Sequence, residues 1–271
     1  MPEKPEVVTV MNSLKTKILG KKITDVNIYW NNIIAYPEAN DFIKKIINQT
    51  INDIKSRGKF IRIILDDYNL LIHLRMEGKF LFRKVNEKIE KHEHVEFILD
   101  NIISFRYKDV RKFGKMYLIE NDLVEKIKPL SKLGLEYNSD KLDVNYLKMK
   151  FKNKNIPIKT ILLDQSIITG IGNIYADEIL FLSRINPYKK GCLLNDNELN
   201  LIIKNTNEVL DKAIKLGGTT IRSFTSEEGV HGLFQNELLV HNQKICCYCN
   251  NKIIKEKINQ RGTYFCKNCQ K

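Results

Sequence analysis

Lys59-Phe60-Ile61-Arg62-Ile63-Ile64-Leu65 opens the part of the chain that decides its fold. It is the first of six short runs rich in β-branched, leucine and aromatic residues. Turn-forming pairs such as Asp66-Asp67 and Asp100-Asn101 separate the runs, and this pattern predicts β-strands. The other five runs lie at residues 70–75, 79–83, 94–99, 102–107 and 115–119.

Helices are predicted beside these strands. Between residues 7 and 18 apolar side chains recur at helical spacing, and Gly20 supplies a C-terminal stop. Residues 26–30 alternate as in a strand, and residues 42–47 again follow a helical pattern. We therefore expect the first part of the chain to be a β-sandwich or barrel flanked by helices.

Past about Lys126 the pattern changes from strands to helices. Apolar periodicity predicts helices at residues 146–151, 157–163, 173–182 and 198–216. Gly217-Gly218 closes the last of them. The change places a domain boundary near residues 125–140, and 271 residues are enough for roughly two domains.

The charge balance favours an anionic polymer as partner. Lys and Arg number 45 against 32 Asp and Glu, which leaves a net charge of +13. Nucleic acid fits such an excess, although the charge alone could serve only solubility. No apolar run approaches the roughly 18 residues of a membrane span, and the N-terminus does not resemble a signal peptide. We expect a soluble, intracellular protein.

Five of the six cysteines crowd near the C-terminus, and four of them have the spacing Cys246-x2-Cys249-x16-Cys266-x2-Cys269. Two close pairs of thiolates joined by a hairpin-length linker suit one tetrahedral Zn²⁺ with every position filled, which is a structural site. Cys247 is surplus, and we treat it as a non-ligand. A hairpin this small needs metal for folding, worth about 10–16 kcal/mol in finger peptides. Its basic side chains indicate a DNA-binding element.

The N-terminal residues Met1-Pro2-Glu3-Lys4-Pro5-Glu6 offer a second kind of chemistry. Removal of Met1 would leave Pro2 with a free secondary amine, and α-amino groups titrate at about 7.7–8.0. Such an amine can attack a sugar or carbonyl carbon to give an iminium, with Glu3 and Glu6 as acid–base partners. The alternative is that the two prolines merely stiffen a loose terminus.

Two further regions are compatible with DNA binding. Residues 164–175 predict helix, glycine-bearing turn and helix, with amides at the second helix available to a phosphate. Glycine-mediated helix packing is the alternative. Residues 73–78 and 106–114 mix basic, aromatic and soft apolar side chains near turns, and such side chains can fill the space left by an extruded nucleotide. Met76 and Phe113 could equally be core residues.

Together these stretches resemble the bacterial formamidopyrimidine-DNA glycosylases over the whole chain. The matching segments are Pro2 to Glu6, Gly172-Asn173-Ile174-Tyr175, Gly217-Gly218-Thr219-Thr220, Phe234 to Leu238, and the four-cysteine hairpin with Gln260-Arg261-Gly262-Thr263. The resemblance implies an α+β multidomain fold. It would comprise an N-terminal catalytic β-sandwich flanked by helices (1–130), a helical domain with a helix-two-turn-helix (131–236) and a β-hairpin zinc finger (237–271).

The resemblance also implies an activity. The protein would be a bifunctional glycosylase and abasic-site lyase of base excision repair that removes 8-oxoguanine and formamidopyrimidines from damaged double-stranded DNA. It would act as a monomer in the bacterial cytoplasm, at the nucleoid, with structural zinc, no organic cofactor and no membrane partner.

Residue roles follow from the same resemblance. Pro2 would attack the sugar C1′, Glu3 would act as general acid and Glu6 would hold the terminus in place. Lys59 and Arg261 match residues that contact phosphates and are linked to β- and δ-elimination. Met76, Arg111 and Phe113 match the intercalating triad, with Arg111 facing the orphaned cytosine. Backbone-binding positions are matched by His92, Lys154, Lys159 and Asn173. The lesion pocket and its lid are matched by Glu77, Gly217, Gly218, Thr219, Thr220 and Arg222.

The chain departs mildly from the family pattern. Lys4 replaces a common leucine, Val8 a common glutamate, and Val110 and Lys112 the usual proline and arginine beside Arg111. A looser turn there would blunt a preference for cytosine opposite the lesion. Two alternatives stay open: an endonuclease VIII-like glycosylase for oxidised pyrimidines, and a non-catalytic zinc protein that binds damaged DNA. The stretch from Arg111 to Phe113 and the segment from Gly217 favour the formamidopyrimidine-DNA glycosylase side.

Overall fold

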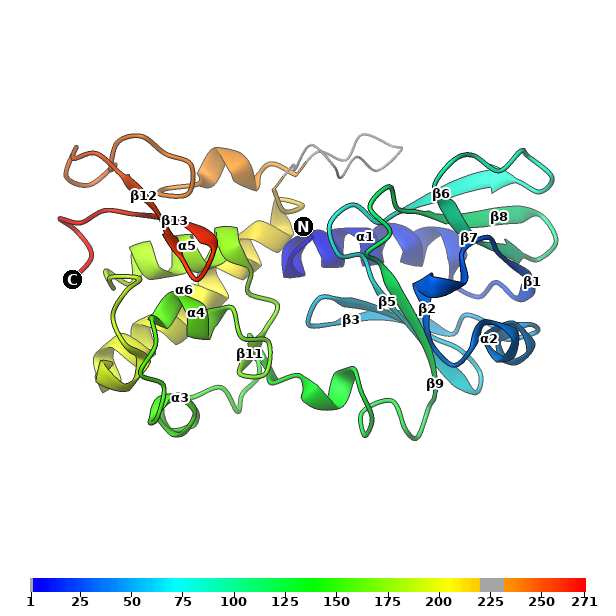
Figure 1. Ribbon diagram of the computed structural model, residues 1–271, viewed down its shortest axis with the longest axis horizontal. Coiled ribbons are helices and arrows are strands. Elements are labelled where there is room, and N and C mark those ends of the chain that lie inside the picture. The colour runs from blue at the N-terminus through cyan, green and yellow to red at the C-terminus, as the bar shows by residue number, and fades with distance from the viewer. Residues whose placement is uncertain (1, 220–231) are drawn as a thin grey trace. The chain divides into compact units, whose positions relative to one another are not determined.

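The computed structural model describes residues 2–219 and 232–271, and the chain divides into two compact units (Figure 1). Unit 1 contains Pro2, Glu6–Ser131 and the described ends of Thr219–Gly232. Unit 2 contains Glu3–Pro5, Lys132–Gly218 and Leu233–Lys271. Among the described residues, no helix combines the length and apolar character of a membrane span.

The described strands of unit 1 form two sheets. The four-stranded sheet has the order β1-β7-β8-β6, with β1 (Ile23–Ile28), β6 (Lys79–Lys84), β7 (Glu93–Leu99) and β8 (Ile103–Lys108). The five-stranded sheet has the order β2-β9-β5-β4-β3, with β2 (Ile34–Tyr36), β3 (Asp53–Arg57), β4 (Phe60–Ile64), β5 (Tyr68–His73) and β9 (Lys115–Glu120). Neighbouring strands are antiparallel except for β2 and β9. The predicted sandwich is confirmed, and the six predicted runs are β4 to β9.

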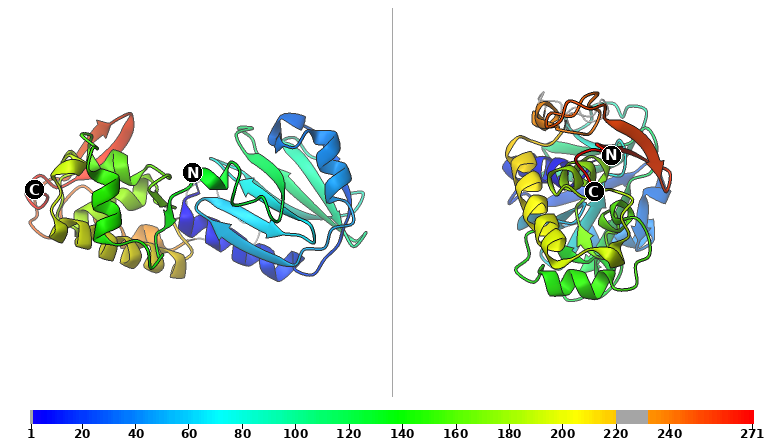
Figure 2. Two further views of the ribbon diagram at one scale, coloured as in Figure 1. Left: turned by 90° about the horizontal axis from the view of Figure 1, so that it is seen from below. Right: turned by 90° about the vertical axis from the view of Figure 1, so that its left-hand side faces the viewer.

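The sandwich and its helices share one core. Phe97 and Phe105 of the first sheet and Ile61 and Ile72 of the second belong to the same cluster of buried side chains, because alternate residues of each strand point inward. The predicted helices are α1 (Lys4–Ile18) and α2 (Ala39–Ile46), and both contribute buried residues to this cluster. In the left view of Figure 2 both helices, coloured blue, lie beside the strands. Gly20 follows α1 with φ +77°, the left-handed conformation in which glycine ends helices.

Unit 2 is built from helices. They are α3 (Val144–Phe151), α4 (Ile158–Leu162), α5 (Asn173–Leu182) and α6 (Asp196–Lys215). Across both units, the short 3₁₀ helices of the described residues are η1 (Asn31–Ile33), η2 (Leu130–Lys132), η3 (Gly191–Leu193) and η4 (Phe234–Glu237). The two-residue strands β10 (Leu135–Glu136) and β11 (Ile168–Thr169) pair in parallel. Helix α5 lies at the centre of the unit 2 core, since Tyr175 and Ile179 are fully buried there.

The C-terminal hairpin consists of β12 (Ile254–Ile258) and β13 (Arg261–Phe265). Ile258 pairs with Arg261, so Asn259 and Gln260 form a two-residue turn with φ of 44° and 64°. Two successive left-handed residues match the natural twist of a hairpin. The turn therefore presents Arg261 at the tip of the finger.

Candidate active site and metal centre

The N-terminal segment is ordered and buried. Residues 2–7 are all buried, and α1 already begins at Lys4. A loose terminus, the alternative interpretation of these prolines, is therefore wrong for residues 2–7. Both carboxylates of the segment, Glu3 and Glu6, accept backbone hydrogen bonds that tie it down.

Glu3 binds the start of α5. Its side chain is 4% exposed, and its Oε1 accepts a hydrogen bond from the backbone N–H of Asn173 at 2.7 Å. An anion is favourable there because the first amides of a helix lack partners and carry partial positive charge. A Cβ at Gly172 would fall on this carboxylate, so the glycine is needed for the close approach. The sequence indicated that the backbone N–H of Asn173 is available to a phosphate, but in the structure it donates its hydrogen bond to Glu3.

Lys4 marks a local departure from the family pattern. It is 6% exposed, its backbone N–H donates to the Gly170 carbonyl at 3.2 Å, and its ammonium lies 2.9 Å from Glu136 Oε2. Gly170 has φ +92°, and a Cβ there would contact the Lys4 side chain. A buried ammonium needs such a partner. Lys4 therefore adds an ion pair to the anchoring of the segment.

Glu6 is the second anchored carboxylate. It is 2% exposed, and its Oε1 accepts from the backbone N–H of Thr219 at 2.8 Å and from its hydroxyl at 3.1 Å. Gly217 and Gly218, just before Thr219, have φ of 74° and 78° and end α6. The predicted lid residues Thr220 and Arg222 lie outside the described residues.

Lys59 lies just before β4 and is 7% exposed. Close to it is His73, to which the sequence assigned no role. The His73 Nδ1 accepts from the Arg75 amide at 3.0 Å. Burial, with the positive charges of Arg75 and Lys59, lowers the pKa of His73 to about 3. The ring is therefore neutral with its proton on Nε2, a fixed donor beside a lysine.

The predicted intercalating residues come together. A guanidinium nitrogen of Arg111 lies 3.3 Å from Met76 Sδ, and the guanidinium carbon lies 4.9 Å from the centre of the Phe113 ring. Met76 is 36% and Phe113 50% exposed. Two exposed apolar side chains stacked around an arginine are unusual for core residues, so the core interpretation of Met76 and Phe113 is wrong. Glu77 is half-buried in the same turn as Met76.

The predicted backbone-binding residues are dispersed. His92 is half-buried on the loop before β7 with φ +72°, and Lys154 is partly exposed, 3.7 Å from Asp164. The Asn173 side-chain amide donates to the Gly262 carbonyl at 3.0 Å. It thus holds the finger hairpin next to Arg261, which is exposed.

Lys159 departs most from its predicted role. Its ammonium is buried, 2.7 Å from Asp177 Oδ1, and donates to the Gly262 carbonyl and the Thr263 hydroxyl, each at 2.9 Å. Burial outweighs the attraction of Asp177 and leaves the pKa of Lys159 below its usual value. With these partners and no exposed surface, the ammonium does not face a phosphate. Lys159 instead fastens the finger hairpin to α4 and α5.

Replacing Lys159 tests this correction. Lys159→Met should destabilise unit 2 by about 3–5 kcal/mol, because it leaves Asp177 as a buried charge without its ammonium partner. Thermal unfolding would show a lower melting temperature. An unchanged melting temperature with weaker DNA binding would mean that the ammonium faces DNA after all.

Four cysteines form a cluster that could hold a metal ion, as in a zinc finger. The Sγ atoms of Cys246, Cys249, Cys266 and Cys269 all lie within 4.8 Å of one another. Two of the Sγ pairs are 3.7 Å and 3.5 Å apart, near the roughly 3.8 Å edge of a tetrahedron with metal–sulfur bonds of about 2.3 Å. Cys246 and Cys266 are fully buried against Phe181, Val240 and Ile253. Cys247 is exposed and outside the cluster, as predicted.

A neighbouring carboxylate supports the base of the finger. Glu178, next to Asp177 on α5, accepts hydrogen bonds from the amides of Leu239, Val240 and His241 at 2.9, 3.1 and 2.8 Å. His241 Nδ1 lies 2.7 Å from Asp177 Oδ2. Both acidic residues of α5 therefore hold the chain that leads into the metal centre.

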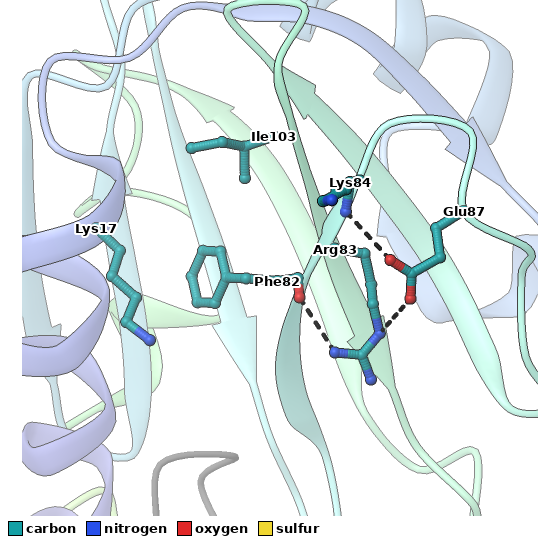
Figure 3. Close-up of a pocket in the computed structure, with 6 residues that line it drawn as sticks. All are labelled: Lys17, Phe82, Arg83, Lys84, Glu87 and Ile103. Carbon is teal, nitrogen blue, oxygen red and sulfur yellow. Dashed lines mark hydrogen bonds and ion pairs between the residues drawn. The ribbon is translucent and has the colours of Figure 1, made fainter.

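Unit 1 has a surface pocket of about 510 Å³ (Figure 3). Its lining residues are Lys17, Phe82, Arg83, Lys84, Glu87 and Ile103. Arg83 and Glu87 pair at 3.2 Å, and the Lys17 ammonium lies 4.7 Å from the centre of the Phe82 ring. Among these lining residues none belongs to the predicted site.

Family models match most of the chain. Residues 1–116 match the formamidopyrimidine-DNA glycosylase N-terminal domain, and residues 133–225 match the H2TH (helix-two-turn-helix) domain of the same enzymes. The chain belongs to the formamidopyrimidine-DNA glycosylase family. It is 41% identical to the formamidopyrimidine-DNA glycosylases of Oceanobacillus iheyensis and Rickettsia africae, covering 100% of this chain and 98% and 99% of theirs.

Solved structures of the family agree. A complex of the Lactococcus lactis enzyme with DNA containing an abasic site has a TM-score of 0.92 at 35% identity, with both chains covered to 100%. A glycine-to-proline mutant of that enzyme, bound to DNA that contains a formamidopyrimidine, has a TM-score of 0.92 at 36% identity, again with both chains fully covered. This chain is thus a DNA glycosylase of a DNA repair family, with the α+β fold predicted from its sequence.

Proposed function

We propose that this protein is a bifunctional DNA glycosylase and abasic-site lyase that excises oxidised purines from duplex DNA. The observation that carries the proposal is the burial of residues 2–7, with Glu3 and Glu6 each accepting backbone hydrogen bonds. An amine on this anchored segment has little conformational freedom left before the substrate binds. A reactant that is already fixed in position reacts faster, because less entropy is lost on the way to the transition state.

In the proposed reaction the lone pair of the Pro2 nitrogen attacks C1′ of the extruded nucleotide. The bond from C1′ to the base breaks, its electrons leave with the base, and the base takes up the proton that the Pro2 nitrogen loses. Glu3 gives a proton to the ring oxygen O4′ as the sugar opens, which leaves an iminium between Pro2 and C1′. Glu6 keeps the segment in place.

Strand cleavage follows from the iminium. Loss of a C2′ proton expels the 3′ phosphate, and loss of a C4′ proton then expels the 5′ phosphate. Each expelled phosphate carries negative charge, so Lys59 and Arg261 would stabilise these steps and contact the DNA backbone. His92 and Lys154 would add backbone contacts, and Met76, Arg111 and Phe113 would fill the space of the extruded nucleotide, as intercalating side chains do.

The metal of the finger would be one structural Zn²⁺. The donor set is four thiols with no water-bearing position among the described ligands, and thiolates in this spacing prefer zinc. The ion would therefore fold the hairpin and take no part in the chemistry. The working unit would be a monomer on chromosomal DNA in the cytoplasm.

The substrate class is tested by initial rates of base release from three duplexes. They carry 8-oxoguanine opposite cytosine, a formamidopyrimidine opposite cytosine, and an oxidised pyrimidine. Faster release of both purine lesions supports the proposal. Faster release of the pyrimidine would instead support an endonuclease VIII-like glycosylase. Binding without release of any base would support a non-catalytic protein that binds damaged DNA.

Arg261 offers a test of phosphate binding. Each phosphate neutralised by a cation steepens the plot of log binding constant against log salt by about 0.9. Arg261→Ala should therefore flatten the slope by about 0.9 and weaken binding. Lys204→Ala, which removes an exposed charge on α6 outside the hairpin, serves as control and should leave the slope unchanged. An Arg261→Ala slope equal to that of wild type would remove Arg261 from the phosphate contacts.

A further inference from the structure

Two loops of unit 1 carry the residues proposed to contact DNA around the extruded nucleotide. His92 lies on the loop before β7, and Arg111 and Phe113 lie on the loop between β8 and β9. A loop distorts at a lower free-energy cost than a strand does. The side chains on a loop therefore keep their positions only where specific hydrogen bonds hold the loop backbone. The bonds that hold these two loops converge on one residue, Asp109.

The Asp109 carboxylate is fully buried and accepts three backbone hydrogen bonds. Its Oδ1 accepts from the Arg111 amide at 3.0 Å, and its Oδ2 accepts from the amides of Phe113 and Gly114 at 2.9 and 2.8 Å. A carboxylate that accepts from residues two, four and five positions ahead fixes the backbone of the whole turn. Two of these amides belong to the residues whose side chains stack together at the surface.

The backbone of Asp109 joins this turn to the other loop. Its N–H donates to the His92 carbonyl at 3.0 Å, and its carbonyl lies 2.8 Å from His94 Nε2. Burial lowers the pKa of His94, so the ring is neutral and donates from Nε2. The His92 loop is fastened at its other end by Arg106, which donates to the carbonyls of Lys88 and Glu87.

The turn that carries Met76 packs against the loop between β8 and β9. The Tyr107 hydroxyl is fully buried between Gly78 and Gly114, and a Cβ on either glycine would fall on it. Gly78 ends the turn that carries Met76, and Gly114 is one of the three residues bound by Asp109. The turns that carry Met76, His92, and Arg111 with Phe113 are therefore built against one another.

We propose that Asp109 is a positioning residue that sets Arg111 and Phe113 against the duplex, and so controls extrusion of the damaged nucleotide. The inference rests on the proposed function. Asp109 touches none of the reacting atoms. It acts through the three amides it holds and through its link to the His92 loop.

The test compares Asp109→Asn with wild type and with the matched control Asp66→Asn. Asp66 also accepts a loop amide, that of Thr50 at 2.7 Å, but it lies in the β4–β5 turn. Three quantities are measured: release of 8-oxoguanine from duplex DNA, borohydride trapping on single-stranded DNA with a ready-made abasic site, and amide hydrogen exchange of residues 110–114. The trapping substrate needs no extrusion, so it reports the Pro2 chemistry alone.

We expect Asp109→Asn to lower duplex base release by about 10-fold or more, the scale on which small misplacements act. Trapping on the single strand should stay within about twofold of wild type, a change too small to count as a loss of catalysis. Exchange at 110–114 should accelerate, and Asp66→Asn should change none of the three. Equal loss of release and trapping, or no loss of either, would overturn the inference.

Amide hydrogen exchange of the wild-type protein tests the role of Asp109 without depending on whether the variant folds. The amides of Phe113 and Gly114 should exchange slowly, although the Phe113 side chain is exposed. Exchange at the rate of an unstructured loop would overturn the role of Asp109. Absence of any trapping by wild type would instead refute the proposed function, and the exchange result would stand apart from it.

Discussion

Glu3→Gln should abolish most base release while leaving DNA binding almost intact. Glutamine keeps the oxygen that accepts the Asn173 amide at 2.7 Å, so the segment stays anchored, but it cannot give up a proton. General acids contribute about 10²–10⁴-fold to rate, and we expect a loss of that size in single-turnover release of 8-oxoguanine. Affinity for a duplex with an abasic-site analogue should change little.

Glu208→Gln is the control for this experiment. Glu208 lies on α6, more than half exposed, in a surface pair with Lys204 at 3.7 Å. It should behave as wild type. A fall of less than about tenfold for Glu3→Gln, well below the general-acid range, would show that another group protonates the sugar.

Removal of the metal should abolish duplex binding without unfolding the sandwich. Cys246 and Cys266 are themselves part of the small core with Phe181, Val240 and Ile253, so that core cannot form around four separated thiols. Unit 1 has its own core. Chelation, or Cys266→Ser, should weaken binding about 100-fold or more through loss of the phosphate contacts of the finger. The thermal transition of unit 1 should persist.

Cys247→Ser separates metal loss from simple thiol loss. Cys247 is exposed and lies outside the ligand cluster, so this variant should bind metal and DNA as wild type does. Metal content is measured on the same samples. Tight binding by protein that has verifiably lost its metal would refute a DNA-binding role for the finger.

The fold was predictable where local pattern and tertiary burial agree. The strands β4 to β9 and the helices α5 and α6 carry apolar residues at the right period, and each lies where the sequence indicated. Strand β3 was missed because Asp53–Arg57 contains a single apolar residue, Ile54. As an edge strand it needs only that one inward side chain, so its sequence has no strand pattern.

The candidate site was predictable by residue type but not by environment. The cysteine spacing indicated the metal centre because two close pairs of thiols, separated by the length of a hairpin, are typical of structural zinc sites. The family resemblance implied that Lys159 contacts the DNA backbone, and only the distance of 2.7 Å to the buried Asp177 shows that its ammonium pairs inside the protein. Asp109 and His73 lie in stretches that the sequence indicated, but neither was assigned a role, because their hydrogen bonds to loop amides depend on contacts that spacing does not encode.

The central claim is that the Pro2 amine forms the covalent intermediate, and borohydride trapping tests it most directly. Purified protein is reduced on a duplex carrying 8-oxoguanine opposite cytosine, beside Pro2→Gly, and the adduct is mapped by mass spectrometry. Intact mass first establishes that Met1 is absent. We predict an adduct on Pro2 that is strongly reduced in the variant. An adduct on Lys59, or tight binding with no adduct, would contradict this claim.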